Sequence, residues 1–125
     1  MTVLEAMAQM EGWGAPNARP TRNNNPLDLE WGPEAKAFGA TGGDPRFAIF
    51  PDAETGWNAG RRWLSVPAKM DDGGNLVGGY MGATVEEVIN RFAPPDENDT
   101  AGYVAYVTEK AGCQPSDVLT PALLG

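Results

Sequence analysis

The 125-residue sequence contains no histidine and only one cysteine, Cys113. The lack of histidine excludes Ser-His and Cys-His catalysis and histidine metal sites, and one cysteine cannot form an internal disulfide. Acid–base chemistry near neutral pH must then come mainly from carboxylates, with tyrosine and lysine as less usual options. The N-terminus lacks the basic start and long apolar core of a signal peptide, so we expect synthesis in the cytoplasm without a signal peptide.

Basic residues and long apolar runs are also scarce. Nine lysines and arginines stand against 17 aspartates and glutamates, which gives a net charge of −8. Phosphate backbones and anionic lipid surfaces repel such a chain, so we expect neither nucleic acid nor a membrane as a partner. No stretch approaches the length of a transmembrane helix. The length suits one domain with a modest core, so we predict a single domain over residues 1–125 and a monomer.

Helices are predicted where a capping residue precedes apolar residues at helical spacing. Capping boxes begin at Thr2 and Thr84, and Asp52 is a further cap. These signals give helices over residues 3–11, 53–64, 84–92 and 100–111, and a short last helix capped by Ser116.

Strands are predicted in the first half of the chain only. Residues 27–31 alternate apolar and polar side chains, and residues 47–50 form a second strand candidate. The turn-rich stretch 38–45 between them predicts a small antiparallel sheet. Residues 70–82 hold five glycines and are predicted as a surface loop. Segregated strands beside several helices predict an α+β fold that is mainly α.

Glu11 lies on the same predicted helix face as Leu4, Met7 and Ala8. A carboxylate on this face would be partly desolvated, which disfavours its charged form and raises its pKa. A carboxylic acid that is still protonated near neutral pH can protonate a glycosidic oxygen. From the helix alone, a surface glutamate at a frayed helix end is the favoured interpretation, because charged residues often sit at the boundary of such a face.

Two other groups have both a binding and a structural interpretation. Asn23, Asn24 and Asn25 offer amide groups that would bind sugar hydroxyls or N-acetyl groups, or would satisfy their own backbone, which is favoured for the tripeptide alone. Trp13 and Trp31 would form the wall of a sugar groove, with core packing as the alternative.

The order and spacing of these pieces resemble the lysozyme-like superfamily, most closely the peptidoglycan-degrading domains of bacteriophages and the soluble lytic transglycosylases. In that superfamily a catalytic glutamate ends the first main helix, and a small β-sheet forms one wall of the cleft. The pieces that carry the resemblance are Met10-Glu-Gly-Trp13, Arg22-Asn-Asn-Asn-Pro26, Leu27-Asp-Leu29, Ala40-Thr-Gly-Gly43, Phe47-Ala-Ile-Phe50 with Gly56-Trp57, Ile89-Asn-Arg-Phe-Ala-Pro-Pro95, and Glu97-Asn-Asp-Thr100 with Tyr103-Val104.

The resemblance implies that Glu11 is the general acid in cleavage of the β-1,4 bond between N-acetylmuramic acid and N-acetylglucosamine. Asn98-Asp-Thr100 with Tyr103 is similar to the Asn-Thr-x-x-Tyr element of lytic transglycosylases, which implies substrate contacts for Asn98 and Tyr103. Related phage domains usually read Asn-Pro-Gly-Asn-Leu where this chain reads Asn25-Pro-Leu-Asp-Leu29. This departure places Asp28 and Glu30 near the presumed cleft, and either is a candidate second carboxylate.

The resemblance also implies glycan strands of peptidoglycan as the partner, no cofactor or metal, and action on the cell wall by a phage-encoded or virion-associated protein. Hydrolysis aided by a second carboxylate and ring closure to an anhydro sugar, as in lytic transglycosylases, both stay open. Chitin or another N-acetylated glycan is an alternative substrate. A non-catalytic lysozyme-like module, for virion structure or wall binding, is the alternative from another functional class.

Overall fold

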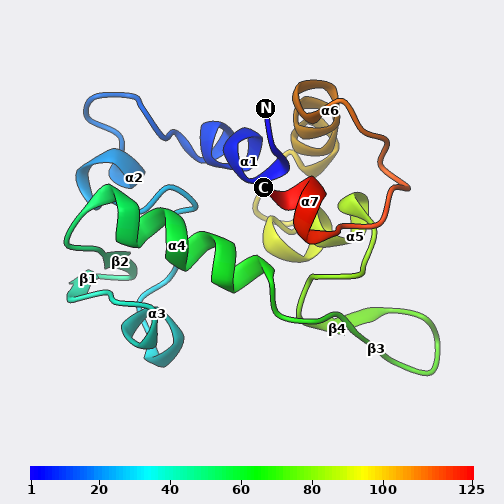
Figure 1. The fold of residues 1–125 in the computed structure, drawn as a ribbon, viewed down its shortest axis with the longest axis horizontal. Coiled ribbons are helices and arrows are strands. Elements are labelled where there is room, and N and C mark those ends of the chain that lie inside the picture. The colour runs from blue at the N-terminus through cyan, green and yellow to red at the C-terminus, as the bar shows by residue number, and fades with distance from the viewer. The chain divides into compact units, whose positions relative to one another are not determined.

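The computed structural model describes all 125 residues and has the predicted α+β class, with helices dominating (Figure 1). No helix combines the length and the apolar character that a membrane crossing requires. The helices are α1 (Val3–Glu11), α2 (Arg19–Arg22), α3 (Pro33–Ala37), α4 (Ala53–Leu64), α5 (Val85–Phe92), α6 (Thr100–Ala111) and α7 (Pro121–Leu124). The strands are β1 (Gly42–Asp44), β2 (Phe47–Ile49), β3 (Lys69–Met70) and β4 (Leu76–Gly78).

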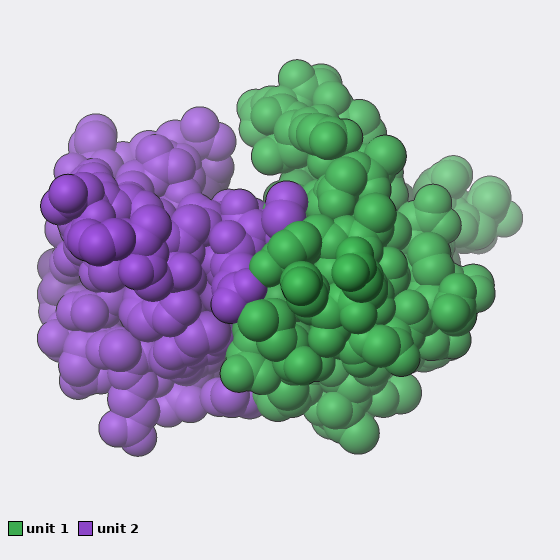
Figure 2. Space-filling view, turned by 90° about the horizontal axis from the view of Figure 1, so that it is seen from above, with its two compact units in different colours: residues 1–6, 64–125 green, residues 7–63 purple.

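The chain divides into two compact units, each with its own part of the fold (Figure 2). Unit 1 consists of residues 1–6 and 64–125, and unit 2 consists of residues 7–63. One boundary therefore falls inside α1 and the other at the last residue of α4. The aromatic residues follow this division, because all four tryptophans belong to unit 2 and all three tyrosines belong to unit 1.

The long helices begin at the capping residues that the sequence predicted. Thr2 and Glu5 form a reciprocal pair before α1, in which the Thr2 N–H donates to Glu5 Oε1 at 2.9 Å and the Glu5 N–H donates to Thr2 Oγ1 at 3.1 Å. Thr84 and Glu87 form the same capping box at α5. Asp52 accepts the Thr55 N–H at 2.7 Å and caps α4. These contacts satisfy backbone donors that a helix start leaves without intrahelical partners.

The short helices were not predicted correctly. Helix α2 lies in the stretch before the asparagines, which was predicted as a loop, and α3 lies where no element was predicted. Each has a proline in its first turn, which suits a helix start because the missing N–H would have no intrahelical partner there. Ser116 does not cap the last helix. Helix α7 instead follows Thr120, whose hydroxyl accepts the Leu123 N–H at 3.2 Å.

The sheet of unit 2 contains the predicted strand at 47–50, but its partner differs from the prediction. β2 pairs antiparallel with β1, which lies in the stretch predicted as a turn. Residues 27–31 do not form a strand, because Asp28 has a φ of 53° and breaks the extended backbone. They run beside β2 through one isolated bridge between Glu30 and Phe47. Gly43 permits this arrangement, since a Cβ there would lie 2.8 Å from Cγ of Trp31.

Unit 1 contains a hairpin where the sequence predicted only a loop. β3 and β4 pair antiparallel across the turn 71–75. Asp71 Oδ1 accepts the N–H groups of Gly73 and Asn75, each at 2.9 Å, so the aspartate organises the turn. The core of this unit joins α5 and α6 with the C-terminal segment, and its fully buried members include Val85, Ile89, Val107, Leu119 and Leu124.

Candidate active site

Glu11 is the last residue of α1 and is half-buried, at the end of a face whose earlier members Leu4, Met7 and Ala8 are almost completely buried. Gly12 follows with a φ of 106°. Its N–H donates to the Gln9 carbonyl and the Trp13 N–H donates to the Ala8 carbonyl, which is the pair of bonds in a Schellman motif. The glycine therefore ends the helix directly after the glutamate and fixes where the carboxylate leaves the helix.

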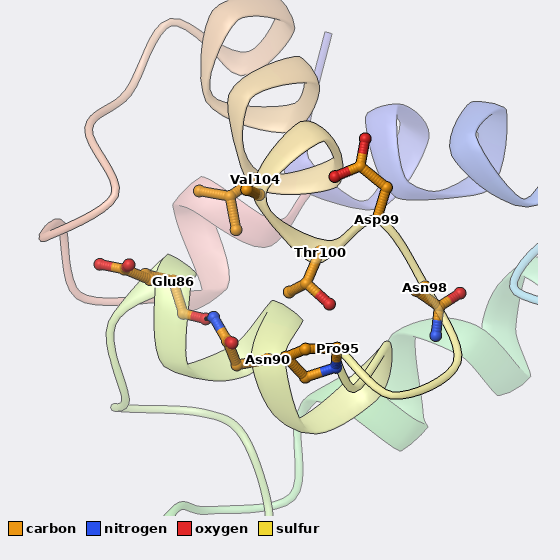
Figure 3. Close-up of a pocket in the computed structure, with 8 residues that line it drawn as sticks. Glu86, Asn90, Pro95, Asn98, Asp99, Thr100 and Val104 are labelled. Carbon is orange, nitrogen blue, oxygen red and sulfur yellow. Dashed lines mark hydrogen bonds between the residues drawn. The ribbon is translucent and has the colours of Figure 1, made fainter.

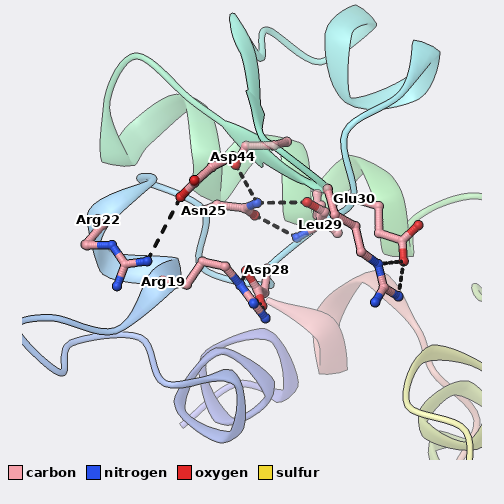
Figure 4. A network of polar contacts seen from close by, with 9 residues as sticks. Arg19, Arg22, Asn25, Asp28, Leu29, Glu30 and Asp44 are labelled. Atoms are coloured by element: carbon pink, nitrogen blue, oxygen red, sulfur yellow. Dashed lines mark hydrogen bonds and ion pairs between the residues drawn. The ribbon is translucent and has the colours of Figure 1, made fainter. Parts of the chain in front are cut away.

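Asp28 is tied to an arginine from α2. Its side chain is only 6% exposed, and Arg19 donates to it from Nε at 3.0 Å to both oxygens and from Nη2 at 2.5 Å (Figure 4). The Arg19 guanidinium also lies 3.5 Å from the centre of the Phe47 ring. Such paired, charge-assisted bonds hold both side chains in one geometry. Asp28 is therefore engaged in an ion pair.

The surroundings of Arg19 connect this ion pair to Glu11. The hydrogen bonds to Asp28 are the largest cause of the raised pKa of Arg19, and the negative charges of Asp28, Glu11 and Asp44 add to it, while burial opposes it. Glu11 thus lies within electrostatic range of the Arg19–Asp28 pair, although the three residues come from different segments of unit 2. The structure thus connects two of the three predicted carboxylates through Arg19, which was not among the predicted site residues.

Glu30, the third candidate carboxylate, forms an exposed ion pair with Arg46. The distance from Arg46 Nη2 to Glu30 Oε1 is 2.6 Å, and the two side chains are 61% and 57% exposed (Figure 4). Exposed pairs of this kind contribute about 0–1 kcal/mol, because water and salt screen them. Glu30 is therefore open to solvent in a way that Asp28 is not.

The asparagine loop is built into the structure of unit 2. Asn25 is fully buried, its Nδ2 donates to the carbonyls of Leu29 and Ala48, and its Oδ1 accepts the Leu29 N–H. No atom of Asn25 remains for a ligand, so its prediction as a substrate-binding residue is corrected to a structural role. Asn24, with a φ of 52°, donates to the Phe50 carbonyl.

Asn23 differs from its two neighbours. The residue is only 4% exposed, and its Nδ2 has no hydrogen-bond partner among the protein atoms. A side chain buried this deeply offers little surface to a glycan, so the structure gives no support to substrate binding by Asn23. Asn24 and Asn25 therefore follow the structural interpretation, in which the amides bond to the backbone, whereas the Asn23 amide nitrogen does not.

The two candidate tryptophans have different surroundings. Trp13 is half-buried and packs edge-on against Trp57 of α4, with ring centres 5.4 Å apart. Trp31 is 38% exposed and lies over Gly43 of β1. Of the two, Trp31 presents the larger aromatic surface to solvent, as a sugar-stacking residue must.

The remaining two predicted site residues belong to unit 1. Tyr103 lies on α6 and is only 3% exposed. Asn98 is exposed in the turn before α6, and its Nδ2 donates to the Pro94 carbonyl at 3.2 Å. No group of three or more His, Cys, Asp or Glu side chains has an arrangement that could hold a metal ion.

Comparison with known proteins gives one informative similarity. No protein family model matches the chain. Over 99 residues, which cover 76% of this chain, the sequence is 34% identical to Protein P5 of Pseudoalteromonas phage PM2. The chain spans 56% of the length of that relative. The similarity connects the chain to a phage protein.

Proposed function

We propose that the chain is a glycosidase that cleaves peptidoglycan between N-acetylmuramic acid and N-acetylglucosamine, with Glu11 as the general acid. The observation that carries the proposal is the position of Glu11. It is a half-buried carboxylate at the end of a buried helix face, fixed there by the glycine that terminates α1. The resemblance of the sequence to phage peptidoglycan-degrading domains also supports this role for Glu11. The similarity to a phage protein supports only the phage part of the proposal.

In this proposal Glu11 donates its proton to the glycosidic oxygen as the bond to that oxygen breaks. Positive charge then develops on the sugar ring, and a carboxylate or a nucleophile must complete the reaction. Trp31 provides an exposed aromatic face for a sugar ring, and Glu30 is the more accessible of the two further carboxylates. The substrate would be the glycan strands of the cell wall, without a cofactor.

The Arg19–Asp28 pair favours a lytic transglycosylase as the second candidate. A carboxylate that is 6% exposed and held by a bidentate arginine is poorly placed to activate a water molecule. The ring-closing route needs no water, because the muramoyl 6-hydroxyl attacks and forms an anhydro sugar. Products of this route are lighter than hydrolysis products by one water molecule.

Mass spectrometry of purified peptidoglycan after digestion tests both candidates in one experiment. We expect soluble fragments with the wild-type protein and a loss of about 100- to 10,000-fold in rate with Glu11→Gln, since the amide cannot act as a general acid. Glu54→Gln is the matched control, because Glu54 is an exposed glutamate of α4 in the same unit. Fragment masses distinguish hydrolysis from ring closure.

Three results would count against the proposal. Near-normal activity of Glu11→Gln would remove Glu11 from the reaction. Binding of the wild-type protein to peptidoglycan without any fragment would favour a non-catalytic wall-binding module. Cleavage of chitin in preference to peptidoglycan would change the substrate.

A further inference from the structure

The ion pair between Arg19 and Asp28 differs from the other ion pairs of the chain in how its two members are buried. The Asp28 side chain is 6% exposed, whereas the Arg19 side chain is 42% exposed. In the other two pairs the acid is about as exposed as the arginine; these pairs are Arg22–Asp44 and Arg46–Glu30. The Arg19–Asp28 pair therefore presents its positive member to solvent and keeps its negative member inside.

The Arg19 guanidinium still has hydrogen bonds to donate. Asp28 occupies one edge of the group, because Nε and Nη2 both donate to its carboxylate (Figure 4). The central carbon Cζ lies 3.5 Å from the centre of the Phe47 ring. Nη1 takes part in neither contact, so the end of the guanidinium, which consists of Nη1 and the second N–H of Nη2, is available to a ligand. Since these contacts already hold the group in place, binding costs little conformational entropy.

Arg19 lies beside the turn that follows Glu11. A Cβ built on Gly12 would lie 3.4 Å from Cβ of Ala18 and 4.0 Å from Cδ of Pro20, the two chain neighbours of Arg19. The turn after the proposed general acid therefore packs against the start of α2. The negative charge of Glu11 reaches the Arg19 guanidinium as well. Contacts and charge thus both place Arg19 in the neighbourhood of Glu11.

The distribution of charge favours unit 2 as the place where an anionic ligand binds. Unit 2 has six basic and seven acidic residues, a net charge of −1, whereas unit 1 has three basic and ten acidic residues, a net charge of −7. The pocket of about 480 Å³ in unit 1 is lined by Glu86 and Asp99 and by no lysine or arginine (Figure 3). A carboxylate is therefore repelled from that pocket, while the Arg19 guanidinium attracts it.

The available end of the guanidinium matches a carboxylate, because its two N–H groups are parallel and can donate to both oxygens. Peptidoglycan carries carboxylates in the lactyl group of N-acetylmuramic acid and in its peptide stems, whereas chitin carries none. We propose that Arg19 binds a carboxylate of peptidoglycan and thereby makes the proposed active site specific for peptidoglycan over chitin. This inference rests on the proposed function, since it names the residue that selects the substrate of the same site.

The test is an NMR titration of the intact protein at low salt with N-acetylmuramic acid, followed by the side-chain Nε–H signal of Arg19. We expect this signal to shift on binding. The methyl ester of N-acetylmuramic acid lacks the negative charge and should bind about tenfold more weakly, because a charge-assisted hydrogen bond is lost. N-acetylglucosamine has no lactyl group and should leave the Nε–H signal unchanged.

Two variants separate Arg19 from the other arginines of unit 2. The double variant Arg19→Gln with Asp28→Asn removes both charges of the pair, so no unpaired carboxylate is left inside, and should bind N-acetylmuramic acid about tenfold more weakly. Arg46→Gln is the matched control and should bind like the wild type, because Arg46 also lies over the Phe47 ring, at 5.1 Å, but its pair is exposed on both sides. Circular dichroism checks that both variants keep their helices.

Muramoyl dipeptide distinguishes the two sources of the carboxylate, because its lactyl group is amidated and its carboxylate lies in the peptide. Tighter binding of N-acetylmuramic acid assigns the lactyl group, and tighter binding of the dipeptide assigns the peptide stem. Equal binding of the acid and its ester, no shift of the Arg19 signal, or an equal loss in the double variant and in Arg46→Gln would overturn the inference. Binding is measured without turnover, so a protein that binds the acid at Arg19 but cleaves nothing would refute the glycosidase proposal alone.

Discussion

Asn25 is the residue whose replacement should most clearly expose how unit 2 is held together. Its side chain makes three hydrogen bonds of 2.9–3.0 Å in a fully buried position. In Asn25→Ala the Leu29 N–H loses its acceptor, and the carbonyls of Leu29 and Ala48 each lose one donor. The Leu29 carbonyl keeps the Ala48 N–H at 2.8 Å, so it is not left without a partner.

The expected cost follows from these three groups. An orphaned buried donor costs about 1–3 kcal/mol, and each lost hydrogen bond to a carbonyl costs about 0.5–1.5 kcal/mol. The free energy of unfolding should therefore fall by about 2–6 kcal/mol, which is a large part of the 5–15 kcal/mol that is typical of a domain. Asn25→Asp keeps the acceptor for Leu29 but places a carboxylate against two carbonyls, so we expect it to be no more stable than the alanine variant.

Urea denaturation followed by far-UV circular dichroism measures this loss. The control is Asn17→Ala, which removes the same atoms from an exposed asparagine of the same unit. We expect the control to unfold within about 0.5 kcal/mol of the wild type, as surface substitutions usually do. If Asn25→Ala behaves like the control, the amide does not hold the loop to β2, and the structural role assigned to Asn25 is refuted.

Three further predictions concern charged groups. Asp28→Asn should reduce thermal stability more than Glu30→Gln, because the Asp28 side chain is only 6% exposed and paired with Arg19 whereas Glu30 is in an exposed pair; melting curves of both variants test the order. Initial rates on peptidoglycan should rise as sodium chloride increases to about 0.1 M, because salt screens the repulsion between a −8 protein and an anionic wall; a steady fall from the lowest salt would refute this. The pKa of Asp52 is lowered because its carboxylate accepts a backbone N–H of α4. The stabilisation from this group is therefore present above the pKa of Asp52 in the unfolded chain and is lost as the pH falls through its lower pKa in the folded protein. Asp52→Asn should lose less stability than the wild type on acidification below about pH 4, as measured by circular dichroism.

The parts of the fold that were predictable depend on contacts between residues close in sequence. The capping boxes at Thr2 and Thr84 and the cap at Asp52 are each formed by groups three residues apart, so their signal is in the sequence itself. The predicted helices α1, α4, α5 and α6 follow from these caps and from apolar spacing. The last helix was misplaced at Ser116 although Thr120 carries the stronger local signal, because Pro121 follows it at the first position of the helix.

The parts that were not predictable depend on pairing across the chain. Nothing in the glycine-rich stretch 42–44 indicates a strand until β2 provides its partner. Asp28 alternates with Leu27 and Leu29 as a strand residue does, yet its backbone is left-handed and its carboxylate faces Arg19, nine residues away. The position of Glu11 was predictable because helical periodicity fixes it, whereas its charged neighbourhood required the folded chain.

The distribution of aromatic residues gives each unit a spectroscopic label of its own. All four tryptophans belong to unit 2, and all three tyrosines belong to unit 1. Fluorescence excited at the red edge of the absorption band, where only indole absorbs, therefore reports on unit 2 alone. Circular dichroism of the helices reports on both units. Unfolding curves recorded with these two probes coincide if the two units unfold as one cooperative structure, and they separate if the units unfold independently. The wild-type protein therefore needs no added label to show whether its two units unfold together.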